Sequence, residues 1–150
     1  MTAAKWTGIG LRGPHVEGLL AGPSDLGFVE VHSENFYADG AVQRQGLDRI
    51  RARWDVSLHG VGLSLGSASG LDTAHLDRLA RLVDEIQPVR VSDHAAFARG
   101  TPDGQTVVHA ADLLPLARTA RSADILVSHI QQVQERLQRR ISIEIGRAHV

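Results

Sequence analysis

The sequence predicts an α/β protein in which the strands of a parallel sheet alternate with helices. Three apolar strand segments each end on polar side chains, at His59, at Asp93-His94 and at Glu144. Amphipathic helix patterns separate the strands, and nearly continuous apolar strands joined by helices are typical of a parallel sheet covered by helices. Five such units fit either an open doubly wound sheet or the front part of an eight-unit barrel.

The strands are predicted from short apolar runs, and the helices from apolar residues at three- and four-residue steps. The predicted strands are Gly8–Arg12, Leu26–His32, Asp55–His59, Val89–His94 and Ile141–Glu144. The predicted helices are His15–Ala21, Gln43–Trp54, a helix from Leu71-Asp72 that Pro88 stops, and a long helix from after Pro115 to about Arg139. The stretch from Ala98 to His109 is rich in glycine and polar residues, so we expect a loop over a site there.

The composition excludes several classes of protein. A chain of 150 residues fits one domain, and a net charge of −1 gives no basic surface for nucleic acid. The sequence has no cysteine, which excludes disulfides and thiolate metal sites, so a metal would be held by imidazole and carboxylate groups. We find no apolar run typical of a signal peptide or of a membrane span, and we expect a soluble cytoplasmic protein.

The candidate site lies at the carboxyl ends of the strands, where active sites of parallel α/β folds gather. His59 is the first candidate, and Gly60 and Gly62 are expected to let the backbone turn tightly beside it. In the adjacent pair Asp93-His94, the two side chains point to opposite faces if the strand continues. Glu144 ends the last strand, although an acid at that place is equally consistent with a cap on the next helix.

Other polar residues are weaker candidates. Glu34 and Asn35 follow the second strand and are placed to line the same mouth, with an ordinary loop role as the alternative. His15, in the first loop, is the weakest candidate. His109 is expected to be a solvated loop residue rather than a lid contact.

The remaining histidines are predicted to serve other purposes. His32 is expected to alternate away from Glu30 along the second strand and to pack. His75 and His129 lie on predicted helices and are expected at the surface.

Six motifs, in this order along the chain, resemble a known family. They are Gly8–Arg12 with His15, Glu30–Phe36, Ser57–Ser67, Val91–His94, Asp112–Leu116 and Ile143-Glu144. Together they resemble the front of the multinuclear non-haem iron-dependent oxidative enzymes, a family long catalogued as a domain of unknown function that includes the methanobactin-biosynthesis oxidase. The resemblance covers essentially the whole chain to Glu144.

The resemblance implies a TIM (β/α)8 barrel, of which this chain holds about the first five β/α units, with two or three iron ions at its C-terminal mouth. It also implies oxygen-dependent modification of cysteine residues in ribosomally synthesised precursor peptides, with a partner protein that presents the peptide. The residues it assigns are His59, His94 and Glu144 as iron ligands, Asp93 as a ligand or close neighbour, and Glu34 and Asn35 as residues of the same mouth.

The resemblance stops at Glu144, so we expect residues 1–144 to be the N-terminal part of a single barrel domain. Residues 145–150 match one reading frame of a common sequencing adapter and are expected to be artefactual, which excludes His149 as a ligand. A genuine stop codon after Val150 in genomic DNA would contradict this hypothesis.

The 150 residues expressed alone are expected to be poorly soluble or molten, and inactive. The reason is that unpaired strand edges would be exposed, and that the apolar side chains predicted to face the barrel interior would lose the opposite wall of the barrel. Those side chains are Val56, Leu58, Val89 and Val91.

Two alternative functions stay open. One is a barrel similar to the xylose isomerase-like families, which would use Mg, Mn or Zn for isomerisation or hydrolysis without redox change. The other is a non-catalytic binding module, favoured if the chain is complete at Val150. Metal analysis separates the two enzyme classes, and a neighbouring gene for a short cysteine-bearing peptide would favour the iron oxidase.

Overall fold

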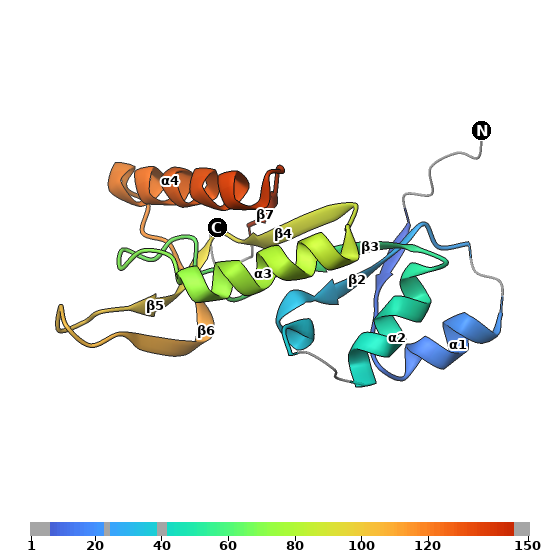
Figure 1. The fold of residues 1–150 in the computed structure, drawn as a ribbon. Helices are drawn as coiled ribbons and strands as arrows, with labels where there is room; N and C mark the ends of the chain where they lie inside the picture. Colours follow the sequence, from blue (N-terminus) through green and yellow to red (C-terminus); the bar gives the residue numbers. More distant parts are fainter. Residues whose placement is uncertain (1–6, 23–24, 39–41, 146–150) are drawn as a thin grey trace.

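The computed structural model describes residues 7–22, 25–38 and 42–145 of the chain. Its centre is a five-stranded parallel sheet with the strand order β1-β2-β3-β4-β7, and β5 and β6 form a separate antiparallel hairpin (Figure 1). Among the described residues, β1 and β7 each pair on one side only, so the sheet is open. This is a mixed α/β fold that is compatible with part of a (β/α)8 barrel.

All five predicted strands and all four predicted helices are present, most of them shorter than predicted. The strands are β1 (Gly8–Gly10), β2 (Phe28–His32), β3 (Asp55–His59), β4 (Arg90–His94), β5 (Ala96–Gly100), β6 (Val108–Pro115) and β7 (Ser142–Glu144). The helices are α1 (His15–Ala21), α2 (Val42–Arg51), α3 (Thr73–Ile86) and α4 (Ala120–Leu137), with a short 3-10 helix η1 (Ser33–Phe36) after β2. No helix in these ranges is long and apolar enough to span a membrane.

The two long helices are capped by side chains that the sequence provides at their first turns. Asp72 precedes α3 and accepts a hydrogen bond from the amide of His75 at 3.0 Å. Thr119 precedes α4 and accepts one from the amide of Ser122 at 3.1 Å. Such N-caps satisfy amides that have no partner within the helix, which fixes where each helix begins.

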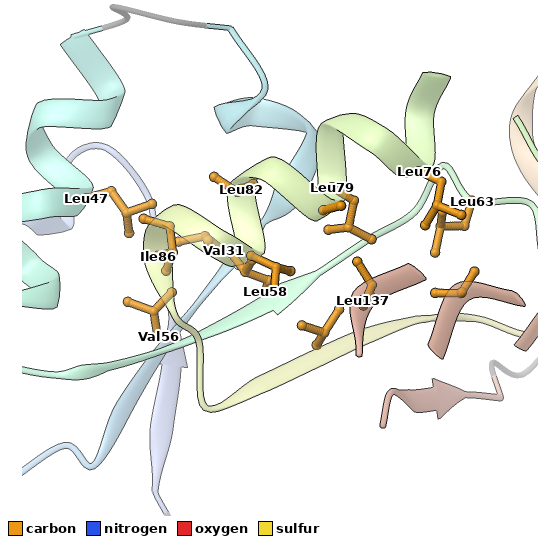
Figure 2. Close-up of a cluster of buried hydrophobic side chains, with 14 of the residues drawn as sticks. Val31, Leu47, Val56, Leu58, Leu63, Leu76, Leu79, Leu82, Ile86 and Leu137 are labelled. Atoms are coloured by element: carbon orange, nitrogen blue, oxygen red, sulfur yellow. The ribbon is translucent and has the colours of Figure 1, made fainter. Parts of the chain in front are cut away.

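The apolar core lies between the sheet and its helices. Val31 and Leu58 are paired neighbours on β2 and β3, and their side chains lie against Leu79 and Leu82 of α3 (Figure 2). Leu47 from α2 and Leu137 from α4 belong to the same buried cluster. Because side chains alternate along a strand, the residues between these apolar positions face the other side of the sheet.

That other side of the sheet is polar, which corrects one prediction. Val56, Leu58 and Val91 were expected to face a barrel interior, but they are buried in the core that the helices cover. Val89 precedes β4 and is 53% exposed. The correction follows from alternation: if His59 faces the open side of the sheet, its neighbour Leu58 must face the helices. The apolar core is therefore built without an opposite barrel wall.

The loop predicted between Ala98 and His109 is partly wrong, because its two ends form the β5–β6 hairpin. Arg99 pairs with His109 and Gly100 with Val108, so only the tip of the stretch is a turn. Val107 and Val108 favour a strand, because β-branched residues suit a pleated backbone. On its other side the hairpin is tied to the segment after β3, where the amide of Gly66 donates to the carbonyl of Ala96 at 2.9 Å.

Candidate metal centre

Three side chains meet at the carboxyl ends of β3, β4 and β7. The Nε2 atoms of His59 and His94 are 3.0 Å apart. Glu144 Oε2 lies 3.4 Å from His59 Nε2 and 3.9 Å from His94 Nε2. The parallel register explains why these side chains meet. His94 of β4 pairs with Glu144 of β7. His59 of β3 pairs with Ser92, which lies two residues before His94 and therefore on the same face of β4. The side chains are 10%, 15% and 53% exposed in the order His59, His94, Glu144.

The donor atoms fit a metal ion. One donor from each of His59, His94 and Glu144 lies within 4.8 Å of the others. Bonds of roughly 2.0–2.2 Å from nitrogen and oxygen ligands to one ion place neighbouring donors roughly 3–3.5 Å apart, close to the separations here. Two imidazoles and a carboxylate form a borderline donor set that suits iron, manganese or zinc.

Ser92 fixes the orientation of the imidazole ring of His59. Its Oγ lies 2.9 Å from Nδ1 of His59 in a buried contact. In the tautomer that binds a metal through Nε2, Nδ1–H donates to this hydroxyl, which is the arrangement that metal-ligating histidines commonly have. Ser92 was not among the predicted site residues, although its place two residues before His94 puts it on the same strand face.

His32 also belongs to this polar face, so the prediction that it alternates away from Glu30 is wrong. The two residues are two positions apart and therefore share a face. The ring of His32 lies 5.7 Å from that of His59 in an edge-to-face contact, and Glu30 accepts a hydrogen bond from Ser57 at 3.0 Å. The two-residue strand period would have revealed this from the sequence.

Asp93 lies on the opposite face of β4 from the three donors. Its Oδ1 accepts from the amide of His94 at 2.7 Å, and its Oδ2 from the amide of Leu63 at 3.4 Å. Burial raises the pKa of the Asp93 carboxyl to about 7, although both amide hydrogen bonds act in the other direction. Asp93 is thus a close neighbour of the donors, outside the group of three.

Glu34 also lies outside the group of three. Its Oε1 accepts from the amides of Val61 and Gly62 at 2.9 and 2.8 Å and lies 3.4 Å from Nε2 of His75. Burial acts to raise the pKa of this carboxyl, but the hydrogen bonds from His75 and Val61 outweigh it, and the pKa lies below its usual value. The neighbouring Asn35 is exposed and lines a separate cavity of about 410 Å³ between α1 and α2.

Two helix histidines are not surface residues, contrary to expectation. His75 is partly buried and lies 3.3 Å from the hydroxyl of Tyr37. His129 is buried, with Nδ1 2.8 Å from the carbonyl oxygen of Leu65. The helical period was the missed signal, because His129, Val133 and Leu137 recur at four-residue steps on the buried face of α4.

The two remaining histidine candidates have no contact with the centre. His15 is exposed, and its Nδ1 accepts from the amide of Arg12 at 3.3 Å. His109 is exposed, as predicted, but it lies on strand β6 and not in a loop. His149 and the other residues of the predicted artefactual tail, except Ile145, lie outside the described residues.

A His-His-Glu group at the carboxyl ends of neighbouring parallel strands is an arrangement typical of the metal sites of α/β enzymes. The profile of the family described as "RiPP precursor modification enzyme MbnB/TglH/ChrH" matches residues 6–149. The chain belongs to this family of enzymes that modify ribosomally synthesised precursor peptides, and the resemblance found in the sequence is confirmed. The match runs past Glu144, and the domain boundary there stays a prediction.

Curated relatives agree with this assignment. A UPF0276 protein of Chromobacterium violaceum is 44% identical over 137 residues, which are 91% of this chain and 48% of the relative. A UPF0276 protein of Rhizorhabdus wittichii is 43% identical over 145 residues, 95% of this chain and 50% of the relative. One of Psychromonas ingrahamii is 41% identical over 137 residues, 91% of this chain and 46% of the relative. The chain spans about half the length of these relatives.

Proposed function

We propose that this chain carries the N-terminal part of an iron-dependent enzyme that uses molecular oxygen to modify cysteine residues of ribosomally synthesised precursor peptides. The observation that carries the proposal is the group of His59, His94 and Glu144 at the strand ends of a chain from a precursor-modifying family. The substrate sulfur would come from the peptide, and none of the 150 residues of this chain is a cysteine. A partner protein that presents the peptide belongs to the same proposal.

Each residue of the centre has a distinct part in the proposed site. His59 and His94 would bind iron through Nε2, and Ser92 would hold the ring of His59 in the binding tautomer. Glu144 is the most exposed of the three donors, and a carboxylate there is suited to contact a second metal ion as well. Bound iron would supply one-electron chemistry towards oxygen and a substrate thiolate.

The three donors are too few for a cluster of two or three iron ions, so the further ligands of such a cluster would have to come from elsewhere in a TIM barrel. We therefore expect the 150 residues alone to bind iron without catalysing the reaction. Mass spectrometry of a cysteine-containing precursor peptide, incubated with the iron-loaded chain and oxygen, would measure this. A mass change in the peptide that depends on the chain would contradict the expectation.

Metal analysis of the 150-residue chain, expressed with iron, manganese and zinc in the medium and purified without oxygen, tests which metal it carries. Imidazole and carboxylate donors suit all three metals, so their chemistry does not select one, and we expect iron at a single site because the proposed oxidation needs a redox-active metal. The matched control is His109→Ala, which removes an exposed histidine of the hairpin and should leave metal content unchanged. Zinc or manganese bound to the exclusion of iron would favour a hydrolase or isomerase, and a chain that binds no metal would favour a binding module.

A further inference from the structure

The loop after His59 is held by carboxylates from both neighbouring strand units. Three consecutive backbone amides of this loop donate to them: those of Val61 and Gly62 to Glu34 Oε1, and that of Leu63 to Asp93 Oδ2. Glu34 lies in η1 directly after β2, and Asp93 lies in β4. β3 pairs with β2 on one side and with β4 on the other, so the loop is held from both sides.

Close packing shows that the loop has little room to move. A Cβ atom at Gly60 would collide with Oδ2 of Asp93, and one at Gly62 would collide with the ring of His75 and lie 3.1 Å from Oε1 of Glu34. Neither glycine has a positive φ, so these positions need glycine for space and not for the backbone freedom that the sequence suggested.

Asp93 also connects the strand ends that carry the two imidazoles. Its buried carboxyl accepts from the amide of His94 with one oxygen and from the amide of Leu63, four residues after His59, with the other. The side chain itself lies on the face of β4 opposite to that of His94. Both of its oxygens are therefore engaged away from the three donors.

We propose that Glu34 and Asp93 are positioning residues: they fix the loop after His59 and so hold the imidazoles of His59 and His94 at the separation that a metal ion requires. They bind no metal themselves. The inference rests on the proposed metal site. Its physical basis is preorganisation, because groups that are ordered before binding need not be ordered by the ligand.

Amide hydrogen exchange of the metal-free chain, followed by NMR, tests without any metal whether Glu34 and Asp93 hold the loop after His59. In Glu34→Ala, the amides of Val61 and Gly62 should lose protection, because their shared acceptor is gone. Glu34→Gln should restore it, since a single carboxamide oxygen can accept from both amides as Oε1 does here. Asp93→Asn should behave differently from Glu34→Gln, because both oxygens of Asp93 accept a hydrogen bond and a carboxamide has only one acceptor atom. In Asp93→Asn, the amide of His94 or that of Leu63 should therefore lose protection. The control Asp77→Asn removes a carboxylate of α3 that pairs with Arg136 of α4, away from the loop, and should leave the exchange of the loop amides unchanged.

Cobalt(II) binding then measures the consequence for the site, because the visible spectrum of Co(II) reports its ligands. Glu34→Ala and Asp93→Asn should bind Co(II) about 10–100-fold more weakly than the unchanged chain, with the same spectrum. His94→Ala should change the spectrum or abolish binding. If Glu34→Ala does not fold, the nearly isosteric Asp93→Asn decides the test.

Unchanged affinity in Glu34→Ala and Asp93→Asn would overturn the inference, and so would an altered spectrum, since that would make them ligands. If the unchanged chain bound no Co(II) at all, the proposed metal site would fail. Amide exchange alone would then decide whether Glu34 and Asp93 hold the loop.

Discussion

His59→Ala is expected to lower the affinity of the chain for Fe(II) by more than about 100-fold, beyond the loss typical of groups that only orient a ligand. Alanine removes the donor that lies closest to both other donors, at 3.0 Å from His94 Nε2 and 3.4 Å from Glu144 Oε2. Competition with a chromophoric chelator under nitrogen measures the affinity. The fold should be retained, because the ring lies on the polar face of the sheet and outside the apolar core.

A control variant shows whether the loss of Fe(II) affinity is specific to His59. His109→Ala removes a histidine from the exposed strand β6 and should bind Fe(II) as the unchanged chain does. Equal affinity in His59→Ala and the unchanged chain would show that His59 is not a ligand.

Leu58→Ala is expected to destabilise the chain by about 2–5 kcal/mol, the usual cost when a buried leucine leaves a cavity. Leu58 is 0% exposed and packs between β3 and the helices, directly next to His59 in sequence but on the other face of the strand. Urea unfolding followed by circular dichroism gives the free energy of unfolding. Substitutions at these two neighbouring positions should therefore have different effects, because the side chains lie on opposite faces of β3: Leu58→Ala should change stability, and His59→Ala should change metal affinity.

The control for this prediction is Val127→Ala on α4. Val127 is 54% exposed, so its truncation should change the free energy of unfolding by no more than about 0.5 kcal/mol. A comparable loss in the two variants would mean that the core does not lie between the sheet and the helices as described.

Because the side of the sheet opposite to the helices is polar, the expectation that the isolated chain is poorly soluble or molten changes. A molten fragment was expected because Val56, Leu58, Val89 and Val91 would face an absent barrel wall. Val56, Leu58 and Val91 are instead buried under the helices, and Val89 is exposed before β4. Only the two sheet edges still favour association of the isolated chain, since β1 and β7 each pair on one side only among the described residues. Size-exclusion chromatography and thermal unfolding would show whether these edges alone cause association.

The strand ends were the part of the site that sequence could predict. His59, His94 and Glu144 each close an apolar strand, and parallel strands of one sheet bring their carboxyl ends to one edge. Strand register then decides which of these residues meet, and that register is not encoded locally. It depends on how the helices pack, so the distances between the three donors come only from the tertiary structure.

Local sequence, by itself, determined the strands of the parallel sheet, the four α-helices, the family and the candidate donors, because two-residue and helical periods and motif order are properties of the chain. It did not determine the β5–β6 hairpin, which was predicted as a loop. Tertiary structure decided the roles of Glu34, His75, Asp93 and His129. Each of these side chains has its hydrogen-bond partner on another element, at Val61 and Gly62, at Tyr37, at Leu63 and at Leu65 respectively. A buried polar group must find such a partner wherever folding brings one within reach, and no local pattern specifies where that will be.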